Sequence, residues 1–170
     1  MPLSDPEAFL RKHYIHEVNM LRQVFRHHKV ANNQIVKNAL YDSFCVHARA
    51  LWDFFSSVSA KGDDVIAQHF ASNWNPGNSI VSQLPSSQRD AINKQVAHLT
   101  DKRENAVPID DAQMQSIHDA LVNDDANFQN QVDLRYRSCF DEEIQASTSV
   151  HIPSQPGQAN VAIYASSVIQ

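Results

Sequence analysis

The sequence contains few of the residues on which several classes of protein depend. Three of its 170 residues are glycine and two are cysteine. Three glycines leave little material for glycine-rich phosphate loops, tight hairpin turns or barrel corners. Two cysteines are too few for a disulfide scaffold or for a zinc site of four thiolates. Those classes of fold and site are therefore excluded.

Long apolar runs and targeting signals are missing as well. No run of about eighteen apolar residues occurs, so no membrane-spanning helix is expected. The first residues have neither a basic start nor an apolar stretch, so no secretory signal is expected either. We therefore predict a cytoplasmic protein in which the thiols of Cys45 and Cys139 are reduced and buried.

Catalytic motifs of fixed spacing are also absent. The chain has no Walker loop, no G-x-S-x-G elbow, no dinucleotide fingerprint and no H-E-x-x-H zinc motif. It also lacks the Glu-x-x-His pairs of di-iron bundles. The sequence thus indicates a fold class more firmly than a function.

Apolar residues recur at helical spacing through most of the chain. Four main helices are predicted, over residues 5–29, 33–57, 86–103 and 110–145, the last with a break near residues 123–125. A short extra helix is predicted over residues 64–71, after a left-handed turn at Gly62. The predicted fold class is therefore all-α, an antiparallel four-helix bundle.

The apolar stripes identify the expected core. The first helix presents the residues Leu10, Tyr14, Val18, Leu21 and Phe25. The second presents Leu40, Phe44, Ala48, Leu51 and Phe55, is widened by Cys45 and Trp52, and is extended at its start by Ile35 and Val36. The third presents Ile92, Val96 and Leu99, and the fourth Met114, Ile117, Leu121, Phe128, Val132 and Phe140. The width of its apolar face places the second helix at the centre of the bundle.

The C-terminal segment differs in composition from the rest. Residues 146–170 contain no Asp, Glu, Lys or Arg, and they include a turn-rich stretch followed by an apolar one. We predict a helical domain over residues 1–145 and an irregular tail over residues 146–170, which is either flexible or docks on a surface. The apolar tail and the wide face of the second helix favour a homodimer.

Charge is distributed unevenly between the predicted helices. Residues 1–37 hold six basic and three acidic residues, and residues 110–145 hold nine acidic and two basic residues. One interpretation is that complementary helix faces guide the packing. The alternative is a basic face on the first helix that contacts phosphate, although the net charge of −5 opposes strong non-specific binding of nucleic acid.

The chain has nine histidines, which allow a metal site to be considered. His13 and His16 lie one helical turn apart, and His47 and His98 approach from other helices. Three imidazoles with an open position suit zinc or nickel, which would make the chain a metal-dependent bundle enzyme. The simpler interpretation is that these histidines lie on the surface or are hydrogen-bonded, and we therefore predict no metal site.

A second polar group lies on the predicted central helix. It consists of Asp42, His47, Arg49 and Asp53. Arg49 and Asp53 are four residues apart and can pair. The group forms either a structural network that ties the second helix to the third or a functional polar cleft.

Two segments resemble a known superfamily. Residues 93–98 follow an Asn-Lys-x-x-Ala-His pattern, and residues 47–54 follow a His-Ala-Arg-x-Leu-x-Asp-Phe pattern. Together with the helix order, these segments resemble uncharacterised and abortive-infection-like members of the HEPN superfamily of bacterial helical bundles, over residues 8–145. The resemblance implies a role in bacterial stress or phage defence, with RNA or protein as partner, and no metal or other cofactor.

Active members of that superfamily are metal-independent ribonucleases that pair an arginine with a histidine across a dimer. The resemblance gives His98 the role of general base toward a ribose 2′-hydroxyl. Asn93 stands where the family has its arginine and brings no charge, so Lys94, Arg103, Arg89 or Lys102 would have to hold the developing charge. This departure favours a silent binding module, with a dimeric ribonuclease as the alternative.

Overall fold

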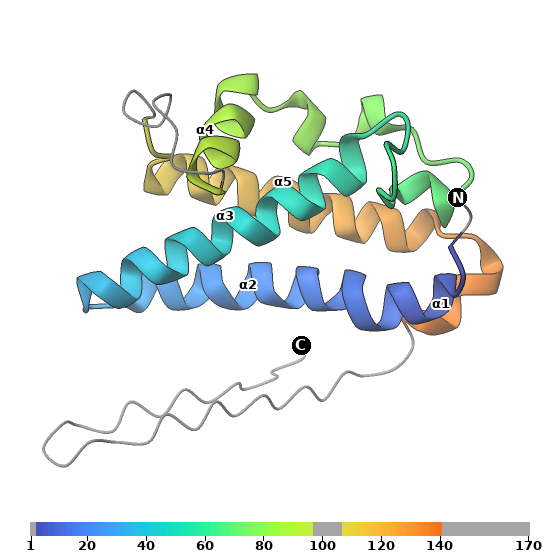
Figure 1. The fold of residues 1–170 in the computed structure, drawn as a ribbon, viewed down its shortest axis with the longest axis horizontal. Helices are drawn as coiled ribbons and strands as arrows, with labels where there is room; N and C mark the ends of the chain where they lie inside the picture. The colour runs from blue at the N-terminus through green and yellow to red at the C-terminus, as the bar shows by residue number, and fades with distance from the viewer. Residues whose placement is uncertain (1–2, 97–106, 141–170) are drawn as a thin grey trace, which may run out of the picture. The chain divides into compact units, whose positions relative to one another are not determined.

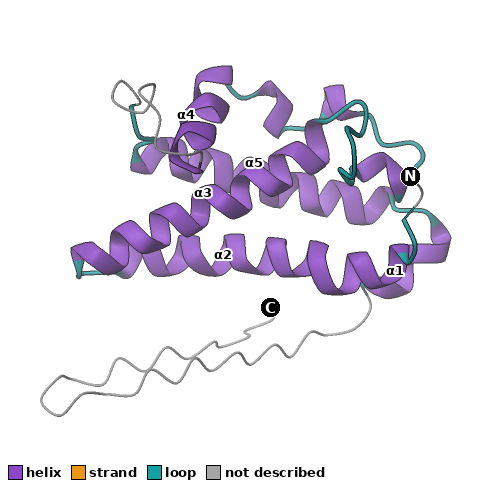
Figure 2. Ribbon diagram, in the orientation of Figure 1, coloured by secondary structure: helices purple, strands orange, loops and turns teal. Residues whose placement is uncertain are grey.

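The computed structural model describes residues 3–96 and 107–140, and every regular element in them is helical, as Figures 1 and 2 show. The α-helices are α1 (Pro6–Phe9), α2 (Ile15–Val30), α3 (Gln34–Ser56), α4 (Ser86–Val96) and α5 (Asp111–Gln131). A π-helical turn, η1, covers Leu10–Tyr14, and the 3₁₀ turns are η2 (Ala67–His69), η3 (Pro76–Asn78), η4 (Val81–Gln83) and η6 (Leu134–Cys139). The predicted all-α class is confirmed. None of the described helices is long and apolar enough to cross a bilayer.

The first predicted helix is confirmed, with an irregularity inside it. Elements α1, η1 and α2 follow one another without a gap from Pro6 to Val30. The carboxylate of Asp5 caps the start by accepting the N–H of Ala8 at 2.9 Å, and Pro6 suits the first turn. The wider π-helical turn contains two residues of the apolar stripe, Leu10 and Tyr14, and both are buried.

Helix α3 lies at the centre, as its wide apolar face predicts. It packs against α2, α4 and α5. The side chain of Asn33 caps its first turn, accepting the N–H groups of Ile35 and Val36 at 2.9 and 3.2 Å. Cys45 and Trp52 are buried inside the chain's own core. That part of the wide face is therefore not free for a dimer partner, and the predicted homodimer loses one of its two supports.

The predicted start of the α3 stripe is wrong. Ile35 is 80% exposed and Val36 is 48% exposed. The cause is visible in Figure 1, where the tip at which α2 meets α3 projects beyond the other labelled helices. Within residues 3–96 and 107–140, the first turn of α3 has helix α2 beside it, and no third helix covers its apolar side chains.

The segment between α3 and α4 also differs from the prediction. Gly62 has a positive φ of 64°, as its turn requires. Helix formation over residues 64–71 is limited to the short turn η2. Ile66 has an extended backbone (φ −123°, ψ 158°), which carries its side chain into the core and prevents a helix from starting at Asp64.

Helices α4 and α5 confirm the predicted starts but not the predicted lengths. Helix α4 is described as far as Val96, and residues 97–103 of the prediction lie outside the described residues. Helix α5 has no break at residues 123–125, and it ends at Gln131. It ends there because the N–H of Asp133 donates to the carbonyl of Phe70 (2.9 Å) instead of continuing the helical pattern. The predicted tail, residues 146–170, lies outside the described residues.

Two consecutive aspartates of α5, at the position where a helix break was predicted, are buried. The carboxylate of Asp124 accepts three hydrogen bonds from the η4 region, from Ser79 Oγ (2.8 Å) and from the N–H groups of Ile80 (2.7 Å) and Val81 (2.9 Å). A buried carboxylate is tolerated when its oxygens are bonded in this way. Asp124 therefore fixes the loop before α4 on helix α5.

Asp125 faces the first helix instead. Its carboxylate accepts bonds from the phenol of Tyr14 (2.5 Å), from Arg22 Nη2 (2.7 Å) and from Gln129 (3.0 Å). Burial raises the pKa of Tyr14, and the neighbouring Asp125 raises it further, so the phenol stays protonated and acts as a donor. The Arg22–Asp125 ion pair joins the basic first helix to the acidic helix α5, as the interpretation of complementary helix faces predicts.

We expect Asp124→Ala to lower the free energy of unfolding by about 3–5 kcal/mol. The substitution leaves two backbone N–H groups and a hydroxyl without their acceptor. Urea unfolding followed by circular dichroism measures the change. Asp119→Ala is the matched control, because Asp119 lies on the same helix with its side chain 56% exposed. Equal losses in the two variants would contradict the role of Asp124.

A second prediction concerns His28, which is 4% exposed and whose Nδ1 has no hydrogen-bond partner among the residues that the structure describes. Burial lowers the pKa of His28, and the nearby Lys37 lowers it further, against an opposing effect of Asp111. The unfolded chain therefore takes up a proton first as pH falls below the ordinary pKa of histidine, and His28 then favours unfolding.

Between pH 7.5 and 5.0 we expect His28→Gln to lose less thermal stability than the unsubstituted chain. His13→Gln serves as the control, because His13 is exposed. Parallel melting curves for His28→Gln and the parent across this pH range would show that His28 does not carry the effect.

Candidate functional site

The residues predicted for ribonuclease activity are only partly described. His98 and Arg103, two members of the predicted catalytic set, lie outside the described residues. Asn93 is half-buried and Lys94 is exposed, both on α4. Arg89, one of the cations considered as a replacement for the family arginine, donates to the carboxylate of Asp53 at 2.5 Å. Its guanidinium is therefore already engaged.

The four residues of the predicted polar cleft separate into different interactions. Asp53 pairs with Arg89 of α4 and, more loosely, with Arg49 at 3.8 Å. This arrangement links α3 to α4, which is what the structural interpretation of the group predicts. Asp42 is exposed. His47 is turned toward the first helix, away from the pair formed by Arg49 and Asp53.

The histidines that were considered as metal ligands come together only in part. His47 Nδ1 lies 2.7 Å from Glu17 Oε2, and the rings of His47 and His16 meet edge to face at a centroid distance of 5.9 Å. The ring of His13 contacts Phe9 instead. Within residues 3–96 and 107–140, no three His, Cys, Asp or Glu side chains are grouped so that they could hold a metal ion.

Cys45 offers no reactive thiol. It is fully buried on α3. Burial raises the pKa of its thiol to about 12, so the sulfur stays protonated at neutral pH. The thiol is therefore a packing group rather than a nucleophile.

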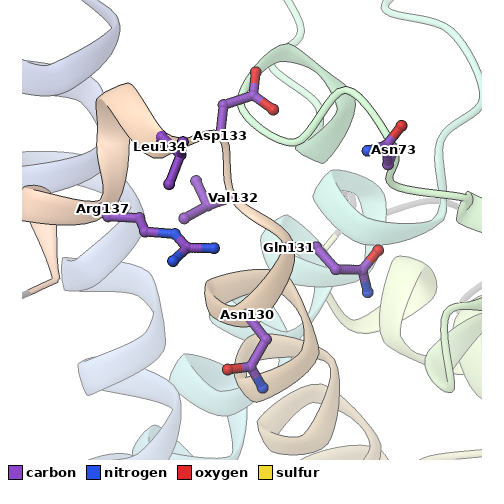
Figure 3. Close-up of a pocket in the computed structure, with 7 residues that line it drawn as sticks. All are labelled: Asn73, Asn130, Gln131, Val132, Asp133, Leu134 and Arg137. Carbon is purple, nitrogen blue, oxygen red and sulfur yellow. The ribbon is translucent and has the colours of Figure 1, made fainter.

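A hollow of about 530 Å³ lies where the chain leaves α5 and enters η6. Figure 3 shows the side chains that line it. They are Asn73, Asn130, Gln131, Val132, Asp133, Leu134 and Arg137. The hollow is a shallow depression that is open to solvent rather than an enclosed cavity. The sequence does not mark this hollow, because one lining residue comes from a loop about sixty residues earlier and the others match no motif.

The walls of the hollow are positioned by bonds to the rest of the fold. Val132 is buried and anchors the turn after α5 in the core. The carboxylate of Asp133 accepts the hydroxyl and the N–H of Ser72 at 3.0 and 3.2 Å. In Figure 3 this carboxylate points away from Arg137, whose guanidinium extends toward Val132. Arg137 of η6 therefore lines the hollow, and the bonds of Asp133 to Ser72 fix the position of the chain at its edge.

The polar groups of the hollow have unused hydrogen-bonding capacity. The side chains of Asn73, Asn130, Gln131 and Arg137 have no hydrogen bond or ion pair within the described part of the chain. A guanidinium offers several N–H groups in a planar fork that matches a carboxylate or a phosphate. Each amide offers both a donor and an acceptor. These four side chains are exposed, so water bonds to them in the free protein, and an anionic ligand would replace that water.

Two further arginines, Arg135 and Arg11, lie near the hollow, and Arg135 pairs with Asp133 on its rim at 3.8 Å. The guanidinium of Arg135 lies 4.6 Å from the ring centre of Tyr136, and Arg11 approaches Ser138 at 3.5 Å. Asp133 is the acidic group on the rim, and its carboxylate is already bonded to Ser72. The lining includes no imidazole, thiol or hydroxyl group. The arrangement is thus suited to binding rather than to nucleophilic or acid–base catalysis.

These observations assign no established activity to the site. Its geometry combines one guanidinium, three amides and a buried valine at the end of α5. In comparisons with known proteins, the chain matches no family model, no curated protein and no solved structure.

Proposed function

We propose that this chain is a binding module without catalytic activity of its own, and that its ligand occupies the hollow between α5 and η6. The observation that carries the proposal is the guanidinium of Arg137, which has no hydrogen bond or ion pair within the described residues and lines the same hollow as three amides that have none either. The ligand is a small molecule with one anionic group, a carboxylate or a phosphate, and several hydrogen-bonding groups.

The resemblance to the HEPN superfamily belongs to the same proposal. It rests on the two sequence patterns and on the order of the helices. An antiparallel four-helix bundle would be formed by the first helix, α3, α4 and α5. A setting in bacterial stress or phage defence, a cytoplasmic location, a homodimer, and RNA or protein as partner follow from that resemblance and the composition.

A ribonuclease is less well supported by the described residues. Its phosphate-binding cation would have to come from Lys94 or from residues outside the described part, because Arg89 is held by Asp53. Asn93 brings no charge to the position of the family arginine. The third candidate, a metal-dependent enzyme, has His16 beside His47 but no third ligand among the described residues. Binding is therefore the function that the described geometry favours.

We expect ribose 5-phosphate to bind in the hollow and ribose not to bind, because the two compounds differ only in the group that pairs with Arg137. A titration of ¹⁵N-labelled protein, followed by NMR, should shift the amide signals of residues 130–137. Arg137→Gln should weaken binding by about tenfold or more, since a charge-assisted bidentate contact is lost.

Arg49→Gln is the control for this titration, because Arg49 is also an exposed arginine and lies on α3, away from the hollow. It should leave the affinity unchanged. Equal binding of ribose and ribose 5-phosphate, or no shift in residues 130–137, would contradict an anion-binding site at Arg137.

The absence of catalysis is tested separately. Purified protein incubated with single-stranded RNA in excess chelator should leave the RNA intact. Cleavage that disappears in His98→Ala would overturn the non-catalytic proposal and favour the ribonuclease. Bound metal in the purified protein that is lost when His16 and His47 are both changed to Ala would favour the metal-dependent enzyme instead.

A further inference from the structure

The tip at which α2 meets α3 carries an exposed apolar patch. The patch consists of Val30 at the end of α2 and of Ile35 and Val36 in the first turn of α3, with exposed fractions of 68%, 80% and 48%. Three large aliphatic side chains on one short hairpin tip are more than the scattered single residues that a protein surface usually shows.

Cations flank this patch along the chain, and α2 and α3 supply no carboxylate close to it. Acidic groups of α5 lie within electrostatic reach, because Lys29 interacts electrostatically with Asp119, and Asp111 with the neighbouring His28. Between Glu17 and Asp42 the chain contains no Asp or Glu. Arg22 is paired with the buried Asp125, which leaves the side chains of Arg26, Lys29 and Lys37 without an ion pair within the described part of the chain. The hairpin tip is therefore apolar at its end and positively charged around it.

The fold explains only part of this composition. Arg26 and Lys29 lie near the C-terminal end of α2, where the helix dipole favours cations, and the ammonium of Lys29 lies 5.2 Å from the ring centre of Phe25. Lys37 is close to the positive N-terminal end of α3, where the dipole disfavours it. Ile35 and Val36 contribute little to folding, because much of each side chain stays exposed to water.

We propose that the hairpin tip is a docking surface for an acidic amphipathic helix of another protein. The apolar face of such a helix would cover Val30, Ile35 and Val36. Its carboxylates would pair with the surrounding cations. A second copy of this chain is opposed by charge, because a two-fold symmetric contact at the tip would bring the same cations together. This inference does not depend on the ligand of the hollow.

The test uses a defined probe, a fluorescent synthetic peptide of about eighteen residues with leucines on one helical face and glutamates on the other. Fluorescence anisotropy should show that it binds the full chain at low salt. A second peptide, with lysine in place of every glutamate, should not bind. Raising the salt concentration to about 0.5 M should weaken binding several-fold, because exposed charges are screened.

Two substitutions at the tip are compared with two matched ones at the opposite end of α3. Ile35→Ser and Lys29→Glu should each weaken peptide binding by about tenfold. Val58→Ser and Lys61→Glu should leave it unchanged, since Val58 is 77% exposed and Lys61 is exposed beyond the end of the helix. All four positions are exposed, so melting temperatures should stay close to that of the parent.

Four results would overturn the proposal. The first is equal weakening by the tip and control variants. The second is binding of phosphatidylserine vesicles without binding of the acidic peptide, which would make the tip a lipid-binding surface. The third is a dimer in analytical ultracentrifugation that dissociates in Ile35→Ser, which would make the occupant a second copy. The fourth is the absence of any peptide binding.

Discussion

The arrangement of the described helices depends on two consecutive buried carboxylates, Asp124 and Asp125. Neighbouring residues of a helix point about 100° apart, so one carboxylate faces the η4 loop and the other faces the first helix. Each carboxylate accepts hydrogen bonds from groups that are distant in sequence. These bonds fix the rotation of helix α5 about its axis and its position along that axis, relative to the η4 loop and to the first helix. Leaving either carboxylate without its donors would cost more than an ordinary surface contact provides. The position of the α5–η6 hollow follows from this constraint, because the chain leaves α5 only two turns later.

The parts of the fold that could be predicted from the sequence are those that local spacing determines. The stripe from Leu10 to Phe25 faces inward because residues three and four apart share a helix face, and Asn33 and Asp110 cap their helices through bonds to residues two or three positions later. The burial of Asp124 could not be predicted in this way. Aspartates in a row are typical of a surface or a helix break, and the groups that bond to Asp124 lie more than forty residues away. The same reasoning explains why Val36 and the neighbouring Ile35 were misplaced, since the spacing of Val36 fits the stripe but no third helix of the described residues reaches it.

The candidate site was harder to predict than the core. Residue types suggested a polar cleft on α3, yet His47 pairs with Glu17 and Asp53 pairs with Arg89, so most of that polarity serves packing between helices. The hollow combines Asn73 with residues 130–137, and amides and arginine carry no fixed spacing that would mark them in a sequence. A useful signal is the balance of charges after the fold is known: an arginine that no carboxylate accompanies is a candidate for an external anion. His98 is a different case, because its role as a base remains a prediction from resemblance.

This balance of charges also separates the two proposed surfaces. Arg22, in the middle of the first helix, pairs with Asp125, whereas Arg26, Lys29 and Lys37 at one end and Arg137 at the other form no ion pair within the described chain, although Lys29 acts on Asp119 of α5. Solvated cations of this kind contribute little to folding, so folding alone does not account for them. Arg11, beside η6, and Val30, at the tip, are nineteen residues apart on nearly continuous helix, which corresponds to about 28 Å. At such a distance, substitutions that share no partner act additively. A substitution that abolishes anion binding at the hollow should therefore leave peptide binding at the tip unchanged, and the reverse should hold as well. Energetic coupling between the two sites would require the helices to change their relative positions when one ligand binds.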